Sequence, residues 1–147
     1  MSGRLLMIGL LGFCTIFGAA LWYYQIYAYY ERVTGVTEVT TEAGSFAVTG
    51  YDGIRATSSP LKLRACFTFD GAAVPEGASV EAATPLTAPP WFTCFDAEQI
   101  SRDLGSGTAR AVRAARNESD GIDRYIALYP DGRGFMWRQL NEKFAEK

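Results

Sequence analysis

The residues best placed to do chemistry in this sequence are two cysteines, Cys66 and Cys94, each set among aromatic residues. Such a pair can form a structural disulfide, remain as two separate buried thiols, or act as a redox or metal-handling dithiol. No Cys-x-x-Cys spacing and no histidine accompanies the pair, so the sequence favours the disulfide. A bridge would stabilise the fold by about 3 kcal/mol by closing the intervening segment. The third cysteine, Cys14, lies in an apolar stretch and cannot take part.

Histidine is absent from the 147 residues of the chain. This absence removes the usual general base at neutral pH and the commonest ligand of metal ions. We therefore expect no catalytic residues, no cofactor and no metal site. An independent hydrolase is the class of protein that the composition disfavours most.

Two short motifs match catalytic or nucleotide-binding patterns only in part. Ser59 and Lys62 have the Ser-x-x-Lys spacing of enzymes in which a lysine activates a serine, but that chemistry needs a helix and the following alternation predicts a strand. The segment Gly105–Gly107 supplies two glycines of a dinucleotide loop, but Arg110 stands where the third belongs. Neither motif predicts an activity.

The charged residues do not indicate a nucleic-acid partner. The chain has 14 Lys and Arg against 16 Asp and Glu, whereas nucleic-acid binding requires a basic face. Three acids, Glu118, Asp120 and Asp123, could form a loose calcium site, but the spacing of a dedicated calcium loop is missing. Seven arginines are interleaved with acids, which favours a solvated, salt-bridged sheet face over a docking surface: Arg102, Arg110, Arg113, Arg116, Arg124, Arg133 and Arg138.

The uncharged stretch Leu5–Tyr30 is the element expected to attach the rest of the chain to a membrane. As a helix it would be about 39 Å long, enough to cross a hydrocarbon core of about 30 Å. Its C-terminal end is rich in aromatic residues, which are typical of the membrane interface: Trp22, Tyr23, Tyr24, Tyr27, Tyr29 and Tyr30. We predict one transmembrane helix that contacts the lipid bilayer.

Two other interpretations of this stretch remain open. The small residues Gly18–Ala20 could precede a signal-peptidase cleavage site, and Leu11–Cys14 resembles a lipoprotein signal. The stretch stays apolar and aromatic for ten residues beyond Ala20, and Phe13 is too large for the position before an acylated cysteine. Both observations favour an uncleaved signal anchor.

Small residues in the same stretch could allow another helix to approach closely. Gly9, Gly12, Gly18 and Ala19 are expected to leave one side of the helix without large side chains, which we call a thin face. Cys14 with Gly18 forms a small-xxx-small pair. We expect these residues to pack against a helix of a membrane-protein complex.

The flanking charges predict the orientation. Arg4 precedes the stretch, and after it only Arg32 comes before Arg55 among the basic residues. The positive-inside rule then places residues 1–4 in the cytoplasm and residues 31–147 outside, which in a bacterium means an inner-membrane protein with a periplasmic domain.

Hydrophobic patterning predicts an α+β fold, with a transmembrane helix over 5–30 and a small, mostly antiparallel sheet domain with one short helix. The helix should begin after Asp96 as N-cap and close at Gly105. Turns are expected at 42–44, 50–53 and 130–134, a long flexible or partner-contacting loop at 71–90, and a helical turn near the C-terminus. Expected strands cover 33–41, 45–49, 54–57, 61–70, 108–117, 122–129 and 135–140. The segment 108–117 is ambiguous, because its arginines also fit one face of a helix, and the strand is favoured.

Three segments near the C-terminus carry a resemblance: 121–125, 130–134 and 137–141. Together with the tyrosine-rich end of the apolar stretch and the Cys66/Cys94 pair, they resemble a family of small single-pass membrane proteins from alphaproteobacteria. The resemblance spans nearly the whole chain. It implies a placement at the membrane and no assigned activity, and it offers no catalytic residues.

The sequence therefore predicts a non-enzymatic accessory or assembly subunit of an inner-membrane protein complex. The alternative is a thiol-redox or metal-handling assembly factor that uses Cys66 and Cys94. The accessibility and ease of reduction of the cysteine pair distinguish the two.

Overall fold

A computed structural model describes residues 2–77, 80 and 82–145 of the chain. The chain divides into two compact units, residues 1–30 and 31–147. The first is one long helix, and the second is a sheet domain with its own hydrophobic core.

The first unit is helix α1 (Gly3–Ile26), whose 24 residues are all unburied. It is long and apolar enough to cross a membrane, at about 1.5 Å per residue. The helix ends four residues earlier than expected: Tyr27 leaves the helical conformation, and Tyr30 already belongs to a strand. The N–H groups of Tyr27 and Ala28 both donate to the carbonyl oxygen of Tyr23, which closes the last turn.

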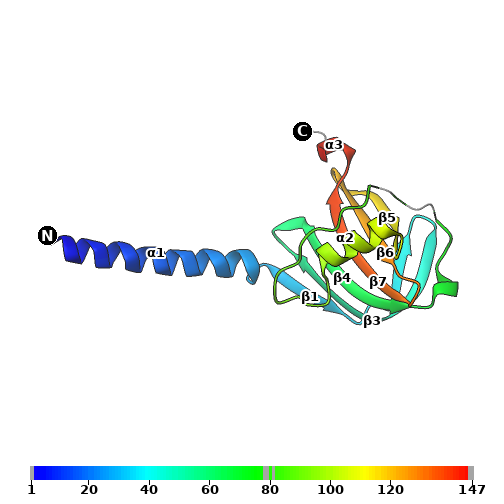
Figure 1. Cartoon of the computed structure of the whole chain (residues 1–147), viewed down its shortest axis with the longest axis horizontal. Coiled ribbons are helices and arrows are strands. Elements are labelled where there is room, and N and C mark those ends of the chain that lie inside the picture. Colours follow the sequence, from blue (N-terminus) through cyan, green and yellow to red (C-terminus); the bar gives the residue numbers. More distant parts are fainter. Residues whose placement is uncertain (1, 78–79, 81, 146–147) are drawn as a thin grey trace. The chain divides into compact units, whose positions relative to one another are not determined.

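The second unit is built on a seven-stranded antiparallel sheet with the order β1-β3-β4-β7-β6-β5, and β2 pairs with β3 (Figure 1). A short 3₁₀ turn, η1 (Gly71–Ala73), follows the fourth strand. The strands are β1 (Tyr30–Thr34), β2 (Glu38–Thr41), β3 (Gly44–Ala56), β4 (Ser59–Phe69), β5 (Arg110–Ser119), β6 (Ile122–Leu128) and β7 (Arg133–Leu140).

The first part of the sheet differs from the sequence-based prediction in two places. The strand expected over 33–41 is divided into β1 and β2, because Gly35 adopts a left-handed conformation (φ 75°). The turn expected at 50–53 is instead an irregularity inside the long strand β3, where the register shifts between Thr49 and Asp52. Gly50 absorbs the extra residue with φ 61°, so the strand bends without ending.

The remaining strands agree with the prediction. The alternation after Leu61 forms β4, the ambiguous segment at 108–117 is the strand β5, and β6 and β7 form a hairpin. The turn between them needs Gly132, which has φ 91° and would bring any Cβ within 2.7 Å of the carbonyl oxygen of Phe69. No residue other than glycine fits there without strain.

One face of the sheet encloses the main hydrophobic core. Strand β2 also approaches strands β5 and β6, which are far from it in the strand order. Arg113 of β5 pairs with Glu42, just after β2, and Arg124 of β6 donates to the carbonyl oxygen of Thr40 in β2. The sheet is therefore strongly curled around its core, which consists of Val39, Phe46, Val48, Ala65, Phe67, Val112, Ala114, Ile126, Leu128 and Met136.

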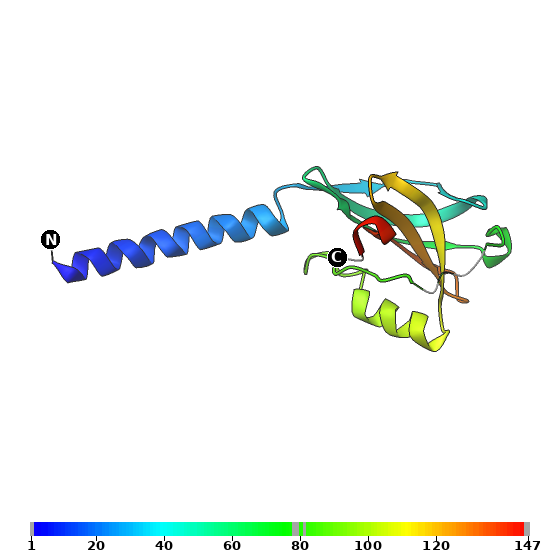
Figure 2. The same ribbon diagram turned by 90° about the horizontal axis from the view of Figure 1, so that it is seen from above.

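The other face of the sheet is covered by helix α2 (Ala97–Ser106) and the segment before it (Figure 2). Trp137 of β7 is completely buried there, with Phe95 against its ring edge and Tyr125 stacked on it. Asp96 is the expected N-cap, because its Oδ1 accepts a hydrogen bond from Gln99 N at 3.1 Å. The helix closes at Gly107 and not at Gly105, since only Gly107 has the left-handed conformation that ends it (φ 80°).

The described chain ends in the short helix α3 (Glu142–Ala145), so the helical turn expected near the C-terminus is confirmed for these residues.

Candidate functional site

Cys66 and Cys94 form the expected disulfide bond. Cys66 lies on β4, opposite Phe135 of β7, and Cys94 lies in the turn before α2. Phe92 and Phe95 beside it are buried, whereas Cys94 itself is exposed and Cys66 is half-buried. Aromatic neighbours in the sequence therefore do not bury Cys94: the rings of Phe92 and Phe95 turn inward, and the bridge faces the surface.

Arg64 holds the covering segment on the sheet. Its side chain is buried (5 % exposed), and Nε donates to the carbonyl oxygen of Leu86 at 2.8 Å. Its Nη1 and Nη2 reach three more carbonyl oxygens, those of Leu61, Leu63 and Thr87. In the alternating pattern of β4, Arg64 occupies one of the polar positions, and nothing local in the sequence indicates that a distant loop covers it.

Gln139 of β7 anchors the preceding part of the same segment. Its Oε1 accepts from Thr84 N at 2.7 Å and from Trp137 Nε1 at 3.0 Å, and its Nε2 donates to the carbonyl oxygen of Ala82. Residues 82–87 of the expected flexible loop are thus hydrogen-bonded to the sheet, which makes them part of the folded domain.

A hollow beside this segment has a volume of about 650 Å³ and lies between residues 82–86 and strands β6 and β7. Asp123 and Gln139, which pair across the two strands, form part of its wall and are both buried. Asp123 Oδ1 accepts from Asn117 N at 2.7 Å and from Asn141 Nδ2 at 3.0 Å. The sequence indicated Asp123 only as one of three acids of a loose calcium site, and no pattern in it predicted this pocket.

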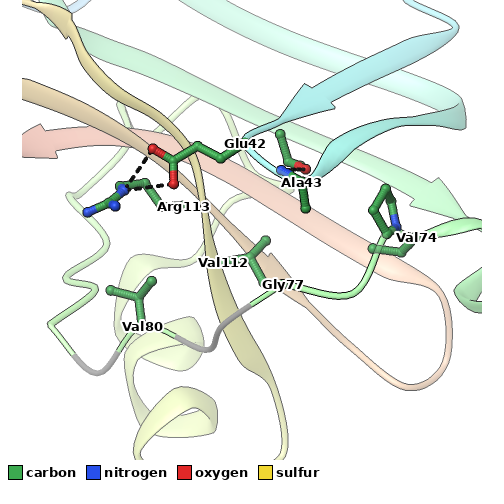
Figure 3. Close-up of a pocket in the computed structure, with 9 residues that line it drawn as sticks. Glu42, Ala43, Val74, Gly77, Val80, Val112 and Arg113 are labelled. Carbon is green, nitrogen blue, oxygen red and sulfur yellow. Dashed lines mark hydrogen bonds and ion pairs between the residues drawn. The ribbon is translucent and has the colours of Figure 1, made fainter.

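A smaller hollow of about 270 Å³ lies where β2 approaches β5 (Figure 3). Arg113 Nε donates to both carboxylate oxygens of Glu42, each at 3.1 Å. Apolar side chains, including Val74 and Val112, form most of the rest of the wall, together with Thr41. This ion pair already neutralises the charged groups of the hollow, so the hollow offers no free charge to a ligand.

The three acids weighed as a calcium site are not brought together. Glu118 pairs with Arg138 at 2.8 Å and Asp120 pairs with Lys143, while Asp123 lies inside the domain. Within the described residues, no three potential metal ligands form a group. Of the seven arginines, five are ion-paired: Arg102, Arg113, Arg124, Arg133 and Arg138.

The two partial motifs have structural roles. Ser59 and Lys62 both lie on strand β4 and, three positions apart, point to opposite faces of the sheet. The segment Gly105–Gly107 is the C-terminal end of α2. Neither arrangement fits the chemistry that its pattern would require.

Two polar pairs join separate elements of the domain. Arg32 of β1 donates Nε and Nη2 to the Asp52 carboxylate of β3, at 2.9 and 2.7 Å. These hydrogen bonds hold the pKa of Asp52 below its usual range. Tyr129 Oη donates to Asp103 Oδ2 of α2 at 2.7 Å, and burial together with this bond raises the pKa of Tyr129.

The small residues of α1 fall on two faces and not on one. At about 100° per residue, Gly9, Gly12 and Ala19 lie on one side of the helix, and Cys14 and Gly18 on the opposite side. A Cβ added at any of the three glycines meets no atom within 4 Å. The helix therefore has two thin faces against which another helix could pack.

These features define a class: a long apolar N-terminal helix, suited to a membrane anchor or signal, joined to a disulfide-bonded antiparallel sheet domain. Over residues 33–147, the chain belongs to the family described as "Family of unknown function (DUF6446)". In the comparisons with curated proteins and with solved structures, nothing matches the chain. The expected membership of a family without assigned activity is confirmed. An origin in alphaproteobacteria and a single membrane pass stay predictions.

Proposed function

We propose that the protein is a membrane-anchored, non-enzymatic accessory or assembly subunit of a bacterial inner-membrane protein complex. Residues 1–4 would lie in the cytoplasm, α1 would span the bilayer, and the sheet domain would lie in the periplasm. The complex partner would pack against a thin face of α1 and contact the domain.

The observation that carries this proposal is the helix itself. None of the 24 residues of α1 is buried, so this apolar surface needs lipid or another helix to cover it. The disulfide supports a periplasmic location, because disulfides persist in oxidising compartments.

The test is quantitative purification of the full chain, tagged at its C-terminus, from native membranes in mild detergent. Glycine-to-isoleucine changes at Gly9 and Gly12 fill one thin face, and the change Gly18→Ile fills the other. Because a Cβ at these positions meets nothing within the chain, the helix itself should tolerate them. We expect one of the two sets of variants to lower the amount of the stoichiometric partner that co-purifies with the chain at least tenfold.

The matched control is the pair Leu6→Ile and Leu10→Ile, which changes side-chain shape on the part of the helix surface between the two thin faces. The proposal falls if wild-type protein is recovered without a stoichiometric partner, or if the glycine variants and the leucine controls retain the partner equally.

Orientation has a separate test in a Cys14→Ser background. A membrane-impermeant maleimide added to intact spheroplasts should label Thr57→Cys, in the exposed turn before β4, and leave Ser2→Cys unlabelled. Labelling at position 2 alone would place the domain in the cytoplasm and contradict the proposal.

A second candidate function, thiol–disulfide exchange, is favoured by the exposure of Cys94. A partner thiolate would attack Cys94 Sγ, forming a mixed disulfide and releasing Cys66 as a thiolate. A second partner thiolate would then displace Cys94, leaving the partner oxidised and both cysteines reduced. Once reduced, the pair could also hold a soft metal ion.

Redox equilibration of the full chain with glutathione separates the two candidates. A reduction potential below about −300 mV marks a structural bridge and supports the accessory subunit, whereas a value near −120 to −200 mV supports thiol exchange.

A further inference from the structure

We propose that the 650 Å³ hollow between residues 82–86 and strands β6 and β7 binds a small organic cation. Its ligand would carry an ammonium or guanidinium group on an apolar body. This site goes beyond the docking role of the protein and does not depend on it.

The hollow has the size and composition of a ligand pocket. Its volume lies within the range of about 300–1,000 Å³ that small-molecule sites occupy. Leu61, Leu86 and Leu140 supply apolar wall, and Leu140 is 42 % exposed at the surface. Asp123, Tyr125 and Gln139 come from the paired strands and supply the polar part.

The charge of the wall selects a cation. None of the residues described as lining the hollow is Lys or Arg, whereas Asp123 and Glu142 are acidic. Asp123 is only 3 % exposed, and none of the ion pairs between described residues includes it. Arg113 acts on Asp123 electrostatically, but its guanidinium is held by Glu42. A buried carboxylate without an ion-pair partner opposes folding, and a cationic ligand would relieve this cost.

The hydrogen bonds of Asp123 leave one oxygen available. Oδ1 accepts two bonds, from Asn117 N and Asn141 Nδ2, and so holds together the β5–β6 turn and the end of β7. Among the described residues, Oδ2 accepts only from Tyr125 Oη, at a long 3.4 Å. A carboxylate can accept about four hydrogen bonds, so Oδ2 has free capacity for an N–H donor.

Gln139, which lies opposite Asp123 on the neighbouring strand of the wall, is already used. Gln139 makes three hydrogen bonds that hold residues 82–84 and Trp137, which leaves it as a support for the wall. The cationic group would therefore bind Asp123 Oδ2, with the apolar body lying along Leu61, Leu86 and Leu140.

The test uses three probes of nearly equal size: benzylamine, benzyl alcohol and benzoate. Each is titrated at neutral pH into the full chain in nanodiscs of zwitterionic lipid, and chemical-shift changes of the Gln139 and Asn141 amides are followed by NMR. We expect benzylamine, as its ammonium ion, to bind at least tenfold more tightly than benzyl alcohol, and benzoate to show no binding.

The variant Asp123→Asn keeps the side-chain shape and an oxygen for Asn117 and Asn141 but removes the charge. It should bring the affinities for benzylamine and benzyl alcohol to within twofold of each other. The control Asp131→Asn removes an exposed carboxylate from the β6–β7 turn and should leave the tenfold preference intact.

The comparison of probes on the wild-type chain needs no variant, so it remains decisive even if Asp123→Asn impairs folding. Equal affinity for benzylamine and benzyl alcohol, binding of benzoate at this site, or a preference that survives Asp123→Asn would each overturn the proposal.

Discussion

At the level of single residues, Tyr129 and Asp103 join the end of β6 to α2 by a hydrogen bond. Tyr129 is 4 % exposed, and its hydroxyl donates to the Asp103 carboxylate at 2.7 Å. A hydrogen bond to a charged group contributes about 1.5–3 kcal/mol to stability. We expect Tyr129→Phe to lower the free energy of unfolding at pH 7 by that amount, measured by urea denaturation of the full chain in detergent.

The same substitution has a pH signature. Burial and the bond to Asp103 raise the pKa of Tyr129, so the folded state keeps the phenol protonated when the unfolded state has lost its proton. The stabilisation is therefore complete below about pH 10 and is lost as pH rises above it. Wild-type stability should fall more steeply than that of Tyr129→Phe above pH 10. Parallel curves, or a change below about 0.5 kcal/mol at pH 7, would contradict this role.

At the scale of elements, the disulfide ties strand β4 to the turn before α2. The cysteines are 28 residues apart, which on the chain-entropy model corresponds to about 3–4 kcal/mol, in agreement with the value of about 3 kcal/mol expected from the sequence. The double variant Cys66→Ser, Cys94→Ser should lose about this much stability in equilibrium unfolding, because the segment between the cysteines is no longer closed.

The matched control is Cys14→Ser, which changes the cysteine outside the bridge and should leave stability of the sheet domain unchanged. A loss below about 1 kcal/mol in the double variant would show that Arg64 and Gln139 hold the covering segment without the bridge.

At the scale of the whole molecule, the sheet domain is its own compact unit, and its core lies between Val39 and Met136. We expect a chain of residues 28–147, which keeps all of β1, to fold without α1. Its midpoint of thermal unfolding should lie within a few degrees of that of the domain in the full chain, measured by near-ultraviolet circular dichroism. Loss of the near-ultraviolet signal would show that the domain depends on α1.

Sequence patterns correctly predicted the features that depend on neighbouring residues. The apolar helix, the alternation in β4, the cap at Asp96 and the turn at 130–134 all arise from local spacing, because side-chain periodicity and turn chemistry act over a few residues. The disulfide was also predictable, because the cysteine pair, the absence of histidine and the predicted oxidising compartment all favour it.

Local patterns failed where long-range pairing decides the outcome. The helix α1 ends early because Tyr30 joins the sheet, and the glycine at position 50 bends a strand that continues past it. Patterning cannot distinguish a glycine that ends a strand from one that bends it, because the difference depends on the partner strand.

The long apolar helix, the antiparallel sheet class and the disulfide could each be predicted from residue type and local spacing. Tertiary contacts were needed to show that Cys94 faces the surface and that Arg64 is buried beneath a distant loop. They also place Asp123 in the wall of a cavity, where no other described residue forms an ion pair with it. The physical reason is that burial is a property of contacts between segments far apart in the chain, and those contacts form only when the sheet curls and residues 82–95 fold over its outer face.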